Sequence, residues 1–365
     1  MTGVGGNPGR SGHALSIESG EIVFSAREEI ARLVGASSPL NVIFCSNATE
    51  ALNLAIQGIL SEGGHAVTTA MEHNSTIRPL AELRRRGAIG LTVVTCPDNG
   101  RVDPGAFERA IRPDTRLAVV NHASNVFGTV QPLSDIASRC SKRGVALLAD
   151  CAQSAGIIPL DMEKCGIDIL AFSGHKGMYG PTGTGGLVLS ERFDRGRMKP
   201  LVYGGTGSRS DSVYQPDFLP DRYESGTLNA AGIAGLGAGV RHILSLQNGV
   251  AGIQLHKKEL SDRFIRAAEE RVRGFIRYIS PALNETGVVS FNIKGMDPSD
   301  VALRLEDRHG ILCRAGLHCA PLAHRTMKTF PGGTVRFSFG IFNAVEDIDR
   351  AVDALEDISG AGRAR

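Results

Sequence analysis

The chain has 365 residues, enough for two domains with their own cores, and its 42% hydrophobic and 21% charged residues are typical of a globular protein. A net charge of +2 provides no electrostatic basis for binding nucleic acid or an anionic membrane, and no apolar run approaches the roughly 20 residues of a membrane-spanning helix. The seven cysteines form no CxxC pair, so we expect neither a disulfide framework nor a zinc site. Without a signal-peptide core, this cysteine usage favours a reducing cytoplasm.

Short apolar runs alternate with amphipathic stretches through the first two-thirds of the chain. The runs are continuously apolar, as expected for strands that are covered on both faces. Their alternation with helical stretches predicts an α/β fold with a mostly parallel sheet covered by helices. The predicted strands are residues 41–45, 66–69, 91–95, 117–121, 145–150 and 168–172.

The pattern changes after about residue 238. Residues 241–272 predict a long helical region rich in charge, and shorter strands and helices follow it. We therefore expect a large α/β domain over residues 1–238 and a smaller C-terminal α+β domain over residues 239–365.

One lysine, Lys176, stands between the apolar run 168–172 and the glycine-rich stretch 180–186. A lysine at the end of a buried strand is costly unless its charge is removed or paired. A Schiff base with pyridoxal 5'-phosphate (PLP) would remove it, and Ser173 and His175 are donors suited to a phosphate. The motif Ser-x-His-Lys alone is more typical of a surface lysine in a turn than of a cofactor-binding lysine. The choice between the two therefore depends on the rest of the chain.

Further polar residues follow the other predicted strands, at the edge where α/β sheets bind ligands. Backbone N–H groups at the helix start near Thr49 favour a phosphate, and an Asp150 carboxylate could keep a pyridine nitrogen protonated. Taken singly, Thr49 is equally typical of a helix cap, His73 of a loop, and Asp150 of a cap or metal ligand. The residues of this group are Ala48, Thr49, His73, Asn125, Asp150 and Gln153.

Eight segments, in order along nearly the whole chain, resemble the class V aminotransferase family of fold-type I PLP enzymes. Within that family they resemble the cysteine desulfurases grouped with selenocysteine lyases. One such motif is weak, whereas eight in register are specific. The resemblance implies the PLP-dependent transferase fold of type I. The segments are residues 46–54, 72–74, 124–129, 149–154, 172–186, 223–229, 314–320 and 335–338.

The resemblance also implies a role for each residue that contacts the cofactor. Lys176 would hold PLP as a Schiff base and move protons at the substrate Cα and Cβ. His73 would stack on the ring and assist proton transfer. Asp150 would pair with the ring nitrogen, and Gln153 would bond the phenolic oxygen. The expected phosphate ligands are Ala48, Thr49, Ser173 and His175.

Two further sets of residues follow from the resemblance. Thr227 would reach the phosphate in the other subunit, which implies a homodimer with shared sites. Asn125, Arg314 and Arg336 would bind the substrate carboxylate, for which the arginine fork is well matched. The family pattern also has an N-terminal segment against the small domain, and we assign the first twenty or so residues there.

Cys319 decides the expected reaction. A buried structural cysteine is the commoner reading of a lone Cys, but the flanking match favours a nucleophile. L-cysteine would be converted to L-alanine with a persulfide on Cys319, which passes to a sulfur acceptor protein or thiol. Only a thiolate is nucleophilic enough for this step. A metal site from Cys313, His318, Cys319 and His324 matches no standard spacing.

Three departures from the family pattern keep alternatives open. The chain begins at Met1 without about twenty family residues, Ala48 replaces a second hydroxyl residue, and Leu317 replaces a second histidine. The alternatives are another class V PLP enzyme (a selenocysteine lyase, aminotransferase or epimerase) and a truncated, weakly active PLP-fold protein.

Overall fold

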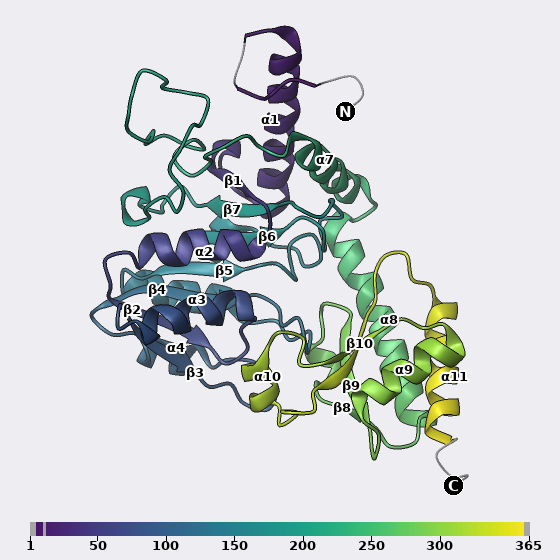
Figure 1. The fold of residues 1–365 in the computed structure, drawn as a ribbon. Coiled ribbons are helices and arrows are strands. Elements are labelled where there is room, and N and C mark those ends of the chain that lie inside the picture. Colours follow the sequence, from purple (N-terminus) through teal and green to yellow (C-terminus); the bar gives the residue numbers. More distant parts are fainter. Residues whose placement is uncertain (1–4, 10–11, 361–365) are drawn as a thin grey trace.

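The chain forms two sheets of unequal size in a computed structural model that describes residues 5–9 and 12–360 (Figure 1). The large sheet has seven strands in the order β1-β7-β6-β5-β4-β2-β3, and the small sheet has four in the order β10-β11-β9-β8. This arrangement confirms the expected combination of an α/β part and a smaller C-terminal α+β part.

In the large sheet, four neighbouring pairs are parallel, and only β7 runs antiparallel to its neighbours β6 and β1. The mostly parallel mixed sheet is therefore confirmed. Its strands are β1 (Val42–Cys45), β2 (His65–Thr69), β3 (Gly90–Val94), β4 (Thr115–Asn121), β5 (Ala146–Asp150), β6 (Ile169–Ser173) and β7 (Gly185–Leu189).

Helices cover both faces of this sheet and create two separate cores. In β5, Leu147 and Ala149 belong to one core and Ala146 and Leu148 to the other. This alternation explains why the strand sequences are continuously apolar. The helices are α1 (Ala14–Val34), α2 (Ala48–Ile59), α3 (Asn74–Arg85), α4 (Pro104–Arg109), α5 (Leu133–Lys142), α6 (Met162–Cys165) and α7 (Ala230–Ser245).

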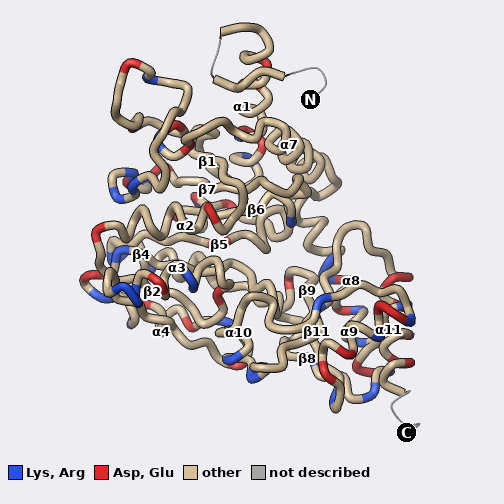
Figure 2. The backbone as a smooth tube through the Cα atoms, viewed as in Figure 1, with Lys and Arg blue, Asp and Glu red and all other residues tan. Residues whose placement is uncertain are grey.

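The small sheet packs against helices around Phe264, whose ring lies 5.1–6.0 Å from four other phenylalanine rings. Arg263 on α8 pairs with Asp349 on α11, within the charged outer layer of this part (Figure 2). No helix in the described ranges is long and apolar enough to cross a membrane. The elements are α8 (Gly249–Arg271), β8 (Phe275–Arg277), β9 (Val288–Ile293), α9 (Pro298–His309), β10 (Arg314–Gly316), α10 (Pro321–Thr326), β11 (Thr334–Ser338) and α11 (Val345–Gly360).

The structure adds detail to the domain organisation at two points. The long helical region expected over 241–272 consists of the end of α7 and of α8, because the chain is extended at Leu246 and left-handed at Asn248. Residue 238 falls inside α7, whose apolar side chains belong to the large core. We therefore propose that the two domains divide between α7 and α8.

The described residues among the first twenty do not lie against the small domain, where we expected this segment. Residues 5–9 and 12–13 precede α1, and α1 and the small sheet lie at opposite ends of the molecule (Figure 1). The reason is the apolar stripe of α1, with Val23, Ala26 and Ile30 buried in the large core beside α7.

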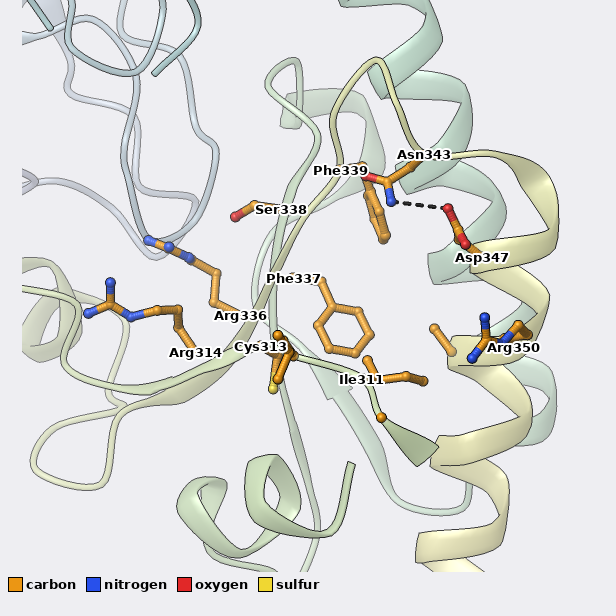
Figure 3. A pocket seen from close by; sticks show the side chains of 13 residues that line it. Ile311, Cys313, Arg314, Arg336, Phe337, Ser338, Phe339, Asn343, Asp347 and Arg350 are labelled. Carbon is orange, nitrogen blue, oxygen red and sulfur yellow. Dashed lines mark hydrogen bonds between the residues drawn. The ribbon is translucent and has the colours of Figure 1, made fainter. Parts of the chain in front are cut away.

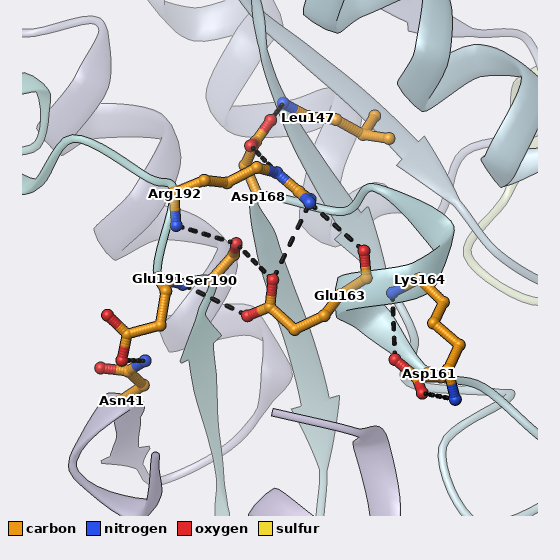
Figure 4. A network of polar contacts seen from close by, with 9 residues as sticks. All are labelled: Asn41, Leu147, Asp161, Glu163, Lys164, Asp168, Ser190, Glu191 and Arg192. Atoms are coloured by element: carbon orange, nitrogen blue, oxygen red, sulfur yellow. Dashed lines mark hydrogen bonds and ion pairs between the residues drawn. The ribbon is translucent and has the colours of Figure 1, made fainter. Parts of the chain in front are cut away.

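A polar network holds the base of the β6–β7 hairpin, whose turn contains Lys176 (Figure 4). Asp168 precedes β6, and its carboxylate accepts from the Leu147 N–H at 2.8 Å and from Arg192 Nε at 3.0 Å. The Ser190 hydroxyl, just after β7, donates to Glu163 on α6 at 3.0 Å. The start of β6 and the end of β7 are thereby tied together.

A buried ion pair joins α1 to the segment before α7. Arg27 and Glu224 are 4% and 8% exposed, and Arg27 donates to both carboxylate oxygens at 2.9 and 2.6 Å. The carboxylate also accepts from the Phe44 N–H in β1 at 2.6 Å. Because each charge is desolvated, removing one partner leaves an uncompensated charge in the interior.

Glu72, fully buried just after β2, links the ends of two parallel strands. Its Oε1 accepts from the Thr69 hydroxyl at 2.7 Å and from the Asn121 N–H in β4 at 3.1 Å. Its Oε2 is buried without a donor. Burial raises the pKa of Glu72 to about 8, so the carboxyl group is a neutral acid at pH 7.

Replacing Arg27 by Met should lower the free energy of unfolding by about 3–5 kcal/mol, because Glu224 stays buried without its partner. The double variant Arg27→Met/Glu224→Gln removes both charges and keeps an acceptor for the Phe44 N–H, so it should be less destabilised. Denaturant unfolding measures both. Arg263→Met is the control, since the Arg263–Asp349 pair is half exposed. Equal losses in Arg27→Met and Arg263→Met would contradict the prediction.

Glu72→Gln should remove a pH dependence of stability. The pKa of Glu72 rises from its ordinary 4.5 to about 8 on folding, so its stabilising contribution exists below pH 4.5 and is lost as the pH rises through 8. Relative to Glu72→Gln, the wild type should lose about 2–3 kcal/mol of unfolding free energy between pH 5 and pH 7. Denaturant unfolding across this range is the measurement. Parallel pH curves for the two proteins would refute the assignment of a neutral acid.

Candidate active site

A cavity of about 190 Å³ opens beyond the carboxyl ends of the parallel strands. This is the edge where α/β sheets bind ligands. Most of the residues that the sequence proposed as cofactor ligands meet here. Those lining the cavity are Ala48, Thr49, His73, Asn125, Asp150, Gln153, Ser173, His175 and Lys176.

Lys176 reaches the cavity from the turn after β6. Burial lowers the pKa of its amine, the nearby Asp150 opposes this effect, and Arg336 adds to it. The turn is closely packed, since a Cβ on Gly177 would lie 2.5 Å from the Ala155 carbonyl oxygen. The position therefore favours an amine without charge, the form that attacks a carbonyl carbon.

The N-terminus of α2 forms one end of the cavity. Asn47 caps the helix by accepting from the Glu50 N–H, and Ala48 and Thr49 of the first turn line the cavity. First-turn N–H groups and the helix dipole together favour an anion. Ser173 adds a buried hydroxyl, 3.2 Å from Nδ1 of His175.

These groups match the chemistry of PLP. The cavity combines an amine for its aldehyde, a helix N-terminus with hydroxyls for its phosphate, and the Asp150 carboxylate for its ring nitrogen. Asp150 ends β5 and is 6% exposed, and its Oδ1 accepts from the Ala152 N–H at 2.9 Å. The residues present therefore fit the cofactor that the motifs implied.

Ser75 is a residue of this cavity that the sequence reasoning missed. Its hydroxyl lies 2.7 Å from Oγ1 of Thr49 and 2.9 Å from Nδ1 of His73. The sequence analysis assigned no role to Ser75. The available signal was its position two residues after His73, at the start of a helix that follows a strand.

The two arginines expected at the substrate carboxylate lie outside this lining, on neighbouring strands of the small sheet. Arg314 in β10 pairs in register with Arg336 in β11, and both side chains extend to the same side (Figure 3). Arg336 donates from Nη1 to the Asn125 carbonyl at 2.8 Å, while its Nε is buried without a partner. Arg336 therefore retains a donor beside the wall of the cavity.

Arg336 also borders a second cavity of about 360 Å³, between β11 and α11 (Figure 3). Its wall includes the Phe337 ring, Cys313 and Arg350. Arg336 thus stands between this space and the 190 Å³ cavity, whose lining residue Asn125 it contacts.

The Asn125 side chain is arranged differently from the expectation. Its Nδ2 donates one hydrogen to the His318 carbonyl at 2.7 Å, which leaves only the second N–H of the amide for a substrate carboxylate. Its Oδ1 is buried without a partner. In this conformation, Asn125 ties the Cys319 loop to the large domain.

Cys319 is exposed and lies on a strained loop that follows β10. His318 and Cys319 have positive φ angles of 47° and 57°, and the Cys319 carbonyl accepts from the Asn74 N–H at 2.8 Å. His318 points into the small domain, with Nε2 3.1 Å from the Thr334 carbonyl, and burial lowers its pKa to about 4. The loop backbone is thus fixed at the start of α3, while the thiol is free.

Thr227 is exposed and is not among the residues that line the 190 Å³ cavity. It follows Gly226, which has a φ of 97°. It belongs to the long segment between β7 and α7, much of which projects beside α1 (Figure 1).

Known proteins resemble this chain over almost its whole length. The family model described as "Aminotransferase class-V" matches residues 1–351. A probable cysteine desulfurase of Methanothermobacter thermautotrophicus is 37% identical over 360 residues, covering 98% of this chain and 88% of that protein. The cysteine desulfurase of Haloferax volcanii is 32% identical over 366 residues, covering 97% and 83%.

Solved structures agree with these sequence relatives. The apo cysteine desulfurase of Thermococcus onnurineus NA1 matches with a TM-score of 0.90 and 32% identity, covering 97% of this chain and 88% of that one. A cysteine desulfurase of Escherichia coli matches with a TM-score of 0.84 and 25% identity, covering 95% and 86%. The resemblance indicated by the eight motifs is confirmed, and this chain belongs to the class V aminotransferase family, whose members depend on PLP.

Proposed function

We propose that this protein is a PLP-dependent cysteine desulfurase that converts L-cysteine to L-alanine and places the sulfur on Cys319 as a persulfide. The observation that carries the proposal is a half-buried amine in the cavity together with an exposed thiol on a loop that is bound beside the cavity. Lys176 lines the cavity, and the backbone of Cys319 is hydrogen-bonded to Asn74, next to the lining residue His73. The names of the relatives support the same reaction.

Arg336 is the proposed ligand of the substrate carboxylate. Its buried Nε has no partner, and a carboxylate there would satisfy it with a charge-assisted hydrogen bond. Arg314, opposite it in register, adds positive charge on the same side. A substrate held by its carboxylate would bring its amino group and Cα toward Lys176.

Lys176 and Cys319 are the proposed reacting residues. When bound, PLP supplies an electron sink conjugated with the substrate carbons. The neutral Lys176 amine removes the Cα proton and later delivers a proton to Cβ. The Cys319 thiolate attacks the substrate sulfur, so that an S–S bond forms, the Cβ–S bond breaks and its electron pair stays with carbon. L-cysteine and thiolate thus give L-alanine and a persulfide, which passes to an acceptor thiol.

A reducing compartment suits this chemistry. All seven cysteines are free, although burial raises the pKa of Cys45, Cys96 and Cys151 and makes these thiols unreactive. Cys319 is the exposed one. We propose the cytoplasm as the location, since free thiols persist there.

We further propose a homodimer with shared sites. Thr227 is exposed away from its own cavity, and large apolar side chains are exposed along the same projecting segment and on α1. Exposed apolar surface of this kind is typical of an interface. The exposed apolar residues are Leu15, Ile17, Phe24, Tyr203, Val213 and Tyr214.

Two substitutions separate cofactor binding from sulfur transfer. Lys176→Ala should lose the covalently held cofactor and its visible absorbance band. Cys319→Ala should keep that band and lose L-alanine and persulfide formation by at least about 100-fold, because the attacking thiolate is gone. The measurements are L-alanine released from L-cysteine and the mass of the sulfur-loaded protein.

Cys313→Ala is the matched control, because Cys313 lies on the same segment six residues earlier but is half-buried. It should transfer sulfur like the wild type. Wild-type rates in Cys319→Ala would eliminate the proposed nucleophile. Transamination without sulfur release in the wild type would point to an aminotransferase instead.

Mixed dimers test the shared site. Lys176→Ala and Thr227→Ala should each be weak as homodimers. Co-expression should restore up to about a quarter of wild-type activity, because each mixed dimer has one site with an intact Lys176 from one subunit and an intact Thr227 from the other. If every subunit supplies its own Thr227, mixing restores nothing, and that result would contradict the shared site.

A further inference from the structure

His73 is held at the start of α3 by a geometry that determines where its proton lies. His73 is the N-cap of the helix, and its Nδ1 accepts from the Ser75 backbone N–H at 3.1 Å. A backbone N–H can only donate, so Nδ1 must be unprotonated. In a neutral imidazole, the proton then resides on Nε2.

The same constraint determines which of the neighbouring hydroxyl groups donates and which accepts in each hydrogen bond. The Ser75 hydroxyl lies 2.9 Å from Nδ1, so it must donate to this unprotonated nitrogen. With its hydrogen used, the Ser75 oxygen accepts from the Thr49 hydroxyl, 2.7 Å away. One chain of donors therefore runs from Thr49 at the α2 N-terminus through Ser75 to His73.

We propose that Ser75 is a positioning residue that holds His73 as the neutral tautomer with its proton on Nε2, so that His73 serves the cavity as a hydrogen-bond donor and not as a base. His73 lines the cavity and its Nδ1 is engaged by Ser75, so Nε2 is the ring nitrogen that remains available to a partner there. Lys176 is then the only base that removes the Cα proton.

The surroundings of His73 support the neutral form. Burial lowers its pKa, Asp150 opposes this shift, and Arg78 adds to it. Protonating Nδ1 would also bring two N–H donors, that of the imidazolium and that of Ser75, into direct contact without an acceptor between them. His65 shows the contrast, because both of its ring nitrogens face threonine hydroxyls, which can donate or accept.

Nitrogen NMR of the holoenzyme labelled with ¹⁵N-histidine tests the tautomer directly. At pH 7.5, His73 should show an unprotonated Nδ1 and a protonated Nε2. His318, whose Nε2 faces the Thr334 carbonyl, provides an internal reference for this tautomer. His73→Gln identifies the resonance by its disappearance. A protonated Nδ1 in the wild type would overturn the proposal.

Ser75→Ala separates the two contacts that Ser75 makes. The variant keeps the backbone N–H and loses the hydroxyl, so the Nε2-protonated tautomer should persist. A switch to the Nδ1-protonated form in this variant would overturn the assignment of the tautomer to the backbone N–H.

Replacing His73 tests the donor role in turnover. His73→Gln keeps a side-chain N–H and should stay within about tenfold of the wild-type kcat, while His73→Phe keeps only the stacking surface and should lose about 100-fold. Equal losses in the two variants would indicate a base and refute the donor role.

This inference rests on the proposed function for where the reaction occurs, but the NMR result needs no turnover. If wild-type protein failed to consume L-cysteine, the tautomer would still be decided independently.

Discussion

The burial of the Lys176 amine, which lowers its pKa, is the constraint on which the rest of the proposed site depends. The amine stands where a fully buried strand ends, and the polar network at the base of the β6–β7 hairpin keeps that strand in place (Figure 4). Burial favours the neutral amine, and the neutral amine is the form that both covalent attachment and proton removal require. The close packing of Gly177 against Ala155 leaves no room for a side chain at position 177 in this turn.

Two sets of contacts join the small domain to the part of the large domain around Lys176. On one side, Tyr179 in the lysine turn packs edge-on against Phe342, with ring centroids 6.1 Å apart, and Ile341 packs on the large core. On the other side, the carbonyls of His318 and Cys319 accept hydrogen bonds from the large domain. The Cys319 loop is therefore anchored through its backbone, which leaves the thiol free to approach a substrate and then an acceptor.

The strands and most of the cavity could be predicted from the sequence for a simple physical reason. Strands covered on both faces are continuously apolar, and polar residues at their carboxyl ends must converge, as Thr49, Asp150 and Lys176 do. The hydrogen-bond partners could not be predicted. Whether the Asn125 amide faces a substrate or the His318 carbonyl depends on how the two domains pack, and no local pattern encodes that.

Details of the domain organisation could not be predicted for a similar reason. The break at Asn248 requires a left-handed residue that the charge-rich helical pattern of 241–272 conceals. The position of α1 follows from the match between its apolar stripe and α7, two segments about two hundred residues apart. Ser75 was missed because its importance lies in a backbone N–H, which every non-proline residue possesses.

Burial acts on the ionisable groups around the cavity in one consistent direction. It favours the neutral form of Lys176, His73 and Glu72 alike, although the charged form of the first two is a cation and that of the third an anion. Asp150 opposes the shift in both Lys176 and His73, so a single carboxylate limits how far each base is weakened. Any change at Asp150 would therefore alter both residues together. Asp150 thus couples the basicity of Lys176 to that of His73, although Arg336 acts only on the first and Arg78 only on the second. A backbone N–H that fixes the position of the His73 proton removes that proton from this coupling, whereas the role proposed for Lys176 requires a proton that can transfer.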